Sequence, residues 1–156
     1  MEKRKLNNEG FSLIELIVVI AIMAILVGAM APQVTKYIEK ARVSNDKQAI
    51  GALYTAVQTA TIDPDITTSS LDLTKTSADA YHDAIKETLG GTSTTAIYTT
   101  GNAGLVKLQS KAYKGASVTV TVDSNNNVTI TVPTVSGYAG AERGFKVDGS
   151  GCNPIS

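Results

Sequence analysis

The chain has 156 residues, which is the length of one ordinary domain with an appendage. Its 14 basic and 14 acidic residues balance, and this argues against a dedicated nucleic-acid-binding protein, in which lysine and arginine are expected in excess. Because Cys152 is the single cysteine, the sequence is not that of a small secreted scaffold held together by internal disulfides.

Residues 11–31 form an apolar run in which Glu15 is the only charged side chain. A helix of this length spans about 31 Å, close to the thickness of bilayer hydrocarbon. The preceding residues include Lys3, Arg4 and Lys5, which keep this end cytoplasmic under the positive-inside rule. We therefore expect a cytoplasmic leader at 1–10, a membrane-spanning helix at 11–31 and an extracytoplasmic remainder.

Glu15 is the residue in this run that most needs an explanation. A charged side chain inside hydrocarbon costs about 2.5–3.5 kcal/mol on insertion scales, and it usually has a partner when it persists. The sequence therefore favours a functional role for Glu15. The alternative is a carboxylate near the membrane edge that reaches the headgroups without a specific partner.

The helical pattern continues past Pro32 to about residue 61, just before Pro64 ends it. Residues 32–61 are amphipathic, so this half of the helix is expected to pack on a domain. The predicted buried face consists of Val34, Ile38, Ala41, Asn45, Ala49, Ala52 or Leu53, Ala56, Val57 and Ala60. The predicted exposed face consists of Lys36, Glu39, Lys40, Arg42, Asp46 and Lys47.

Two features of the apolar half concern how the helix bends and packs. Pro32 removes a hydrogen-bond donor and clashes with the carbonyl of Gly28, itself a poor helix former, so a kink or an easily melted turn is expected there. Ala21, Ala24, Gly28 and Ala31 fall on one stripe that would allow close helix approach, although small residues are common in such segments anyway.

Residues 62–156 are predicted to form a small α+β head, beginning with a short helix near 76–91. Thr76 and Asp79 match a capping box, and Gly90 with Gly91 provides the stop. The apolar side of this helix consists of Tyr81, Ile85 and Leu89.

Alternating segments at 94–100, 104–110, 116–123 and 127–133 predict an antiparallel sheet. The last two would pair as a hairpin through residues 124–126. Their inward side chains would be Val118, Val120, Val122, Val128, Ile130 and Val132. The Gly-rich tail at 136–156 is predicted to be a loop that folds over a sheet edge. The fold class is therefore α+β, a long N-terminal helix packed on a small antiparallel sheet.

The stretch "GFSLIELIVVIAIMAILVGAMAP" resembles the N-terminus of type IV pilins and pseudopilins. The resemblance rests on a basic leader ending in Gly10, on Phe11 after it, on Glu15 five residues in, and on Pro32 within the helix. It implies that a prepilin peptidase cleaves between Gly10 and Phe11 and methylates the new amino group of Phe11. It also implies a helical homo-oligomeric filament in which Glu15 pairs with the Phe11 ammonium of a neighbouring subunit, because a cation makes a buried carboxylate tolerable.

The sequence departs from many bacterial pilins in its cysteines, because Cys152 has no mate with which to close a C-terminal disulfide loop. No LPxTG-like sorting motif is present either. The missing motif argues against covalent attachment to a cell wall, and the missing disulfide is compatible with a Gram-positive or anaerobic source.

Catalytic and metal-binding patterns are weak, and we expect no enzyme, no cofactor and no metal site. His82, the only histidine, is expected to be solvated or half-packed. Residues 123–127 begin like a calcium loop, but Val128 replaces the required glycine and Thr134 the closing glutamate, so a hairpin turn is expected. Asp63 and Asp65 could offer carboxylates to calcium, but no further acids cluster nearby.

Lys107, Lys111 and Lys114 form a modest basic group in and after a predicted strand. It could touch DNA or another polyanion, but a solvated strand edge that blocks aggregation explains it equally well. A nucleic-acid partner is therefore possible but unsupported.

Three functions fit the sequence to different degrees. The favoured one is a structural subunit of an extracellular type IV pilus, serving adhesion, surface motility or DNA uptake. Such a subunit would wait in the cell membrane as a single-pass protein and work with an assembly platform and its ATPase machinery. The alternatives are a pseudopilin of a type II secretion or competence system, and a membrane-tethered enzyme or receptor, against which the lack of a catalytic set counts.

Overall fold

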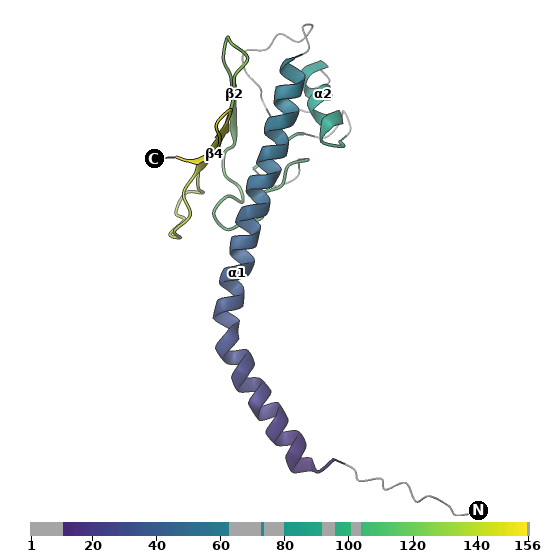
Figure 1. The fold of residues 1–156 in the computed structure, drawn as a ribbon, viewed down its shortest axis with the longest axis vertical. Coiled ribbons are helices and arrows are strands. Elements are labelled where there is room, and N and C mark those ends of the chain that lie inside the picture. The colour runs from purple at the N-terminus through teal and green to yellow at the C-terminus, as the bar shows by residue number, and fades with distance from the viewer. Residues whose placement is uncertain (1–10, 63–72, 74–79, 92–95, 101–103, 156) are drawn as a thin grey trace, which may run out of the picture. The chain divides into compact units, whose positions relative to one another are not determined.

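A computed structural model describes residues 11–62, 73, 80–91, 96–100 and 104–155 of the chain (Figure 1). It contains two helices, α1 (Leu13–Thr61) and α2 (Ala80–Thr88). The four strands among the described residues are β1 (Thr119–Val122), β2 (Val128–Val132), β3 (Phe145–Asp148) and β4 (Gly151–Pro154). The predicted α+β class is confirmed. The leader at 1–10, the capping box at Thr76 and Asp79, and the pair Asp63 and Asp65 lie outside the described residues.

The chain divides into two compact units, residues 1–38 and residues 39–156, and α1 runs from one into the other. In the first unit every described residue, from 11 to 38, is exposed. The helix continues through Pro32 without a break. The predicted single helix over 11–61 therefore agrees with the structure to within two residues at its start.

In the second unit one face of α1 enters the core, but its position differs from the predicted face. The buried side chains are Val43, Asp46, Ile50, Leu53, Ala56, Val57 and Ala60. The prediction was right from Leu53 onward, and Ala49 is partly buried against the core. It was wrong earlier in the helix, where Ala41 and Asn45, like Val34 and Ile38, are exposed. The physical reason is Asp46, which the sequence placed on the solvent face, although its carboxylate is buried and hydrogen-bonded to another segment.

Helix α2 lies across α1 from the sheet in Figure 1 and contributes Tyr81 and Ile85 to the core, as predicted. Gly90 follows the helix with a φ of 73°, the left-handed conformation typical of a helix C-terminus, and the Gly91 N–H donates to the carbonyl of Lys86. The expectation for His82 was wrong, because this side chain is buried and lies edge-on to Tyr81 with ring centroids 6.4 Å apart. A nine-residue helix in the core leaves few of its positions to solvent.

The four strands form one antiparallel sheet in the order β1-β2-β3-β4. The predicted hairpin is confirmed, with Val120 opposite Ile130 and Val122 opposite Val128. Its turn is fixed by Asp123, whose carboxylate accepts from the backbone N–H groups of Asn125 and Asn127, both at 2.8 Å. The inward side chains of β1 and β2 join α1 and α2 in one hydrophobic core.

The tail was predicted to be a loop, and this was wrong, because residues 145–154 form the hairpin of β3 and β4. The short pattern "FKVD" alternates, with Phe145 and Val147 buried and Lys146 exposed. Pairing with β2 gives hydrogen-bond partners to the backbone groups along one edge of β3. This favours a strand even though the region is rich in glycine.

The segments at 94–100 and 104–110 were predicted to be strands of the sheet, and among their described residues this was also wrong. They meet in a single parallel bridge between Tyr98 and Val106. The predicted alternation of burial is confirmed only in the second segment, where Val106 and Leu108 are in the core and Lys107 is exposed. In the first segment Ala96, Ile97 and Tyr98 are all buried. An alternating sequence does not report the partner to which the backbone bonds.

Candidate assembly site at the start of the long helix

The first turn of α1 is held by a capping arrangement between Ser12 and Glu15. The Ser12 carbonyl accepts the Leu16 N–H at 3.3 Å, and the Ser12 N–H donates to Glu15 Oε2 at 2.9 Å. A Glu three residues after the N-cap that reaches back to its N–H is one half of a capping box. Ser12 was not predicted as a capping residue, although the pattern Ser-x-x-Glu over 12–15 is the signal that would have identified it.

This contact changes the physical description of Glu15. Its carboxylate receives a backbone N–H from its own chain and lies at the positive end of the helix dipole, which favours a negative charge by about 0.3–1 kcal/mol at exposed positions. An ionised carboxylate has about four lone-pair sites, so one such bond leaves capacity for a cation as well. Glu15 can therefore cap its own helix and pair with a second charge at the same time.

The side chains around Glu15 present a continuous apolar surface. Phe11 is 91% exposed and Leu13 76%, and the large apolar side chains along the helix up to Met30 are also exposed. Of the residues that the structure describes, only α1 is a helix long and apolar enough to cross a membrane, with a mean hydropathy of 2.9 in its most apolar window. A surface of this size needs lipid or other apolar helices around it.

Gly28 and Pro32 lie in the same exposed part of α1. Apart from the backbone of α1 itself, no described atom lies within 4 Å of the place where a Cβ on Gly28 would stand, so this position leaves room for another helix to approach closely. Thr35, which the sequence analysis did not single out, donates its hydroxyl to the Ala31 carbonyl at 2.9 Å, a contact that often accompanies helix bending. That the turn opens or kinks between Gly28 and Pro32 stays a prediction.

Of the predicted site residues, Phe11 lies just before α1 and Glu15 in its first turn, whereas Gly28 and Pro32 lie further along the helix. Gly10 lies outside the described residues. Cys152 lies on β4, exposed, and beside a pocket of about 280 Å³ lined in part by Lys47, Glu142 and Arg143. Among the described residues no group of three His, Cys, Asp or Glu side chains could hold a metal ion.

Comparison with known proteins supports the importance of this stretch. Residues 5–31 match the family described as the prokaryotic N-terminal methylation motif. Three relatives, each a type IV major fimbrial protein FimA from Dichelobacter nodosus, are 40% identical to the chain over 56 residues.

These alignments cover 36% of the chain and 35–36% of each relative, so the chain matches only about a third of the length of the relatives. No solved structure matches the chain significantly. The chain therefore carries a prokaryotic N-terminal methylation motif and is similar, over about a third of its length, to type IV major fimbrial proteins.

Proposed function

We propose that the chain is the structural subunit of an extracellular type IV pilus. The observation that carries the proposal is the exposed apolar half of α1, in which Glu15 is the single charged side chain and lies at the helix start. In a filament this half would leave the membrane and pack against its copies, which replaces lipid by other helices. The proposed role is structural and not enzymatic.

The proposal divides the chain into four parts with different tasks. Residues 1–10 are a cytoplasmic leader that a prepilin peptidase removes at the Gly10–Phe11 bond, after which Phe11 is N-methylated. Residues 11–31 span the cell membrane and then form the filament core, and residues 32–61 connect this core to the head. Residues 62–156 form the head outside the cell. An assembly platform with its ATPase would drive the transfer from membrane to filament.

Glu15 would favour the assembled filament over the single subunit in the membrane. In the membrane its carboxylate has the Ser12 N–H and the helix dipole as partners. In the filament the Phe11 ammonium of a neighbouring copy would add a full positive charge in apolar surroundings. Removing one member of a buried charge pair costs about 3–5 kcal/mol, so loss of the carboxylate would strongly disfavour the filament.

The substitution Glu15→Gln tests this role, because glutamine keeps the size of the side chain and an oxygen that can accept the Ser12 N–H. Only the charge is lost. We expect cleaved, methylated subunit to accumulate in the membrane with few or no filaments in electron micrographs of sheared cell surfaces. Mass spectrometry of the wild-type filaments should give a subunit beginning with N-methylated Phe11.

A matched control is Glu87→Gln, which removes an exposed charge from α2 and should leave filaments intact. Normal piliation by Glu15→Gln would refute charge pairing as the purpose of Glu15. The alternative function, a pseudopilin of a type II secretion or competence system, shares the same N-terminus. It would be preferred if wild-type cells carried no long sheared filaments of this subunit while secretion or DNA uptake still required it.

A further inference from the structure

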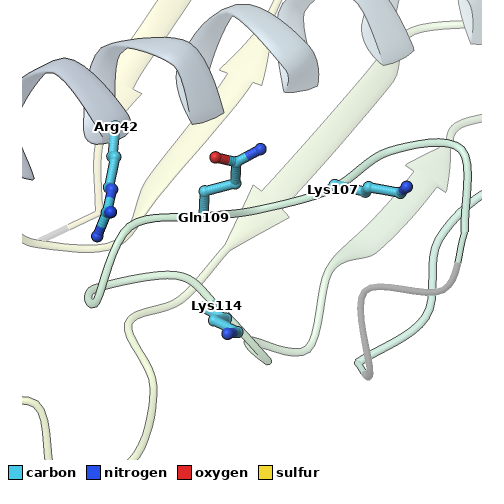
Figure 2. Close-up of a pocket in the computed structure, with 4 residues that line it drawn as sticks. All are labelled: Arg42, Lys107, Gln109 and Lys114. Atoms are coloured by element: carbon cyan, nitrogen blue, oxygen red, sulfur yellow. The ribbon is translucent and has the colours of Figure 1, made fainter.

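A second feature, in residues 39–156, is an open pocket between α1 and the segment that follows Val106. Its volume is about 360 Å³, and four of the described residues line it, Arg42, Lys107, Gln109 and Lys114 (Figure 2). Three of these side chains are cationic and the fourth is an amide, which both donates and accepts hydrogen bonds. None of the described lining residues is acidic. This concentration of positive charge occurs in a chain whose overall charge is zero.

The rim of the pocket is held in place by buried groups. Asp46, on α1, accepts the Gln109 N–H at 2.8 Å and the Ser110 N–H at 2.9 Å. The Lys114 N–H donates to the Ser110 carbonyl at 2.9 Å, which folds residues 110–114 into a tight turn. On the other side Lys107 lies between two core residues, Val106 and Leu108. The backbone at each lining position is therefore fixed even though the lysine side chains reach into solvent.

The residues that the structure describes compensate the positive charges of the pocket only weakly. Lys107 and Lys114 form no ion pair with any residue that the structure describes. Arg42 has one long contact, 3.8 Å between its Nη1 and Glu39 Oε2, while the other Glu39 oxygen accepts the Lys111 N–H. Like charges that share a pocket repel each other, and a bound anion would remove this repulsion.

We propose that this pocket binds the phosphate group of a small phosphorylated ligand. A carboxylate has two oxygens and is satisfied by one guanidinium, whereas a phosphate offers three or four oxygens in different directions. The pocket matches the second pattern, because its donors come from α1, from the segment after Val106 and from the turn at 110–114. Its volume lies at the small end of the range for ligand sites, about 300–1,000 Å³, and leaves room for a group about the size of one sugar next to the phosphate.

The proposal does not depend on assembly into a filament, so it can be tested on the full chain in detergent micelles. The probes are inorganic phosphate and glucose 6-phosphate, with glucose as the uncharged control, and the readout is saturable binding by titration calorimetry or NMR. We expect both phosphates to compete for one site and glucose not to bind. Lys114→Gln and Arg42→Gln should each weaken phosphate binding about tenfold, since each removes one charge-assisted contact.

The matched control is Lys40→Gln, which removes the same charge from an exposed position of α1 that does not line the pocket. It should change phosphate affinity less than twofold. Equal weakening by Lys40→Gln and Lys114→Gln would show only general charge attraction and would overturn the proposal. Two other results would overturn it as well. The first is saturable binding of duplex DNA by a chain that binds neither phosphate. The second is the absence of phosphate binding together with loss of filaments in the Lys114→Gln variant. That second result would mean that the pocket binds an acidic group of a neighbouring copy.

Discussion

The buried carboxylate of Asp46 provides the sharpest test of how the second half of α1 is attached to the head. Asp46 is 1% exposed. It accepts the Gln109 N–H at 2.8 Å, the Ser110 N–H at 2.9 Å and the Ser110 hydroxyl at 2.5 Å. Asp46→Ala removes both acceptor oxygens and leaves the three donors facing a small apolar methyl group.

The loss of stability expected for Asp46→Ala depends on which of these donors water can reach. Gln109 is exposed, so its N–H can be hydrated, whereas Ser110 is fully buried and its two donors cannot. A buried donor without a partner costs about 1–3 kcal/mol, so the two Ser110 donors together predict a loss of about 2–6 kcal/mol. We take about 4 kcal/mol as the expected decrease in the free energy of unfolding, a large fraction of the stability of a small domain.

The assay is urea unfolding of the full chain in detergent micelles, followed by the near-ultraviolet circular dichroism of the buried tyrosines. Asn45→Ala is the matched control, since it truncates the exposed neighbour on the same helix and should change the free energy by less than about 0.5 kcal/mol. A decrease below about 1 kcal/mol for Asp46→Ala would refute the reasoning, because it would mean that water or another acceptor satisfies Ser110.

Three further predictions concern the head. Gly104→Ala should destabilise it by about 1–3 kcal/mol in the same urea assay, because a Cβ there would stand 2.8 Å from the Tyr98 Cα and 2.9 Å from the Ile97 carbonyl oxygen. Gly51→Ala, where no atom lies within 4 Å, should instead stabilise it by up to about 1 kcal/mol, and equal effects of the two would contradict the packing argument. Burial raises the pKa of Tyr113 from 10.0 to about 12. The neutral phenol therefore contributes stability that is fully present below pH 10 and is lost as the pH rises toward 12. Complete phenolate absorbance by about pH 11 in the folded chain would contradict this. Cys152→Ser should leave folding and filament formation unchanged, because the thiol is exposed, and failure to assemble would instead indicate a bridge between subunits.

The parts of the fold that the sequence predicted are those in which one local signal dominates. The helix from 13 to 61 follows from a long apolar and then amphipathic run that Pro64 ends. The hairpin of β1 and β2 follows from two alternating segments around an Asn-rich turn, with Asn126 at a φ of 59°. In both cases the residues that determine the structure are close together in the chain.

The parts that the sequence did not predict depend on distant partners. Gly149 and Gly151 interrupt the tail and made it read as a loop, but β3 pairs with β2 and gives β4 an edge to join. The segments near Tyr98 and Val106 were predicted to be strands of the sheet, but among the described residues they meet in a single parallel bridge. An alternating sequence alone does not tell a strand of the sheet from a segment with one bridge. Backbone pairing depends on which other segment lies next to it in the fold.

The two carboxylates that the sequence analysis treated most differently share one physical feature. Glu15 was singled out because it lies in an apolar run, and Asp46 was assigned to solvent because it lies in a charged one, yet both accept backbone N–H groups in the structure. A carboxylate is an acceptor with several lone pairs, so nearby backbone donors can replace the water that it loses on burial. The two carboxylates differ in how many of their hydrogen-bonding sites are occupied. Asp46 has three donors and is closed within the head, whereas Glu15 has one and is exposed, and this remaining capacity is what a neighbouring Phe11 ammonium would fill in the proposed filament.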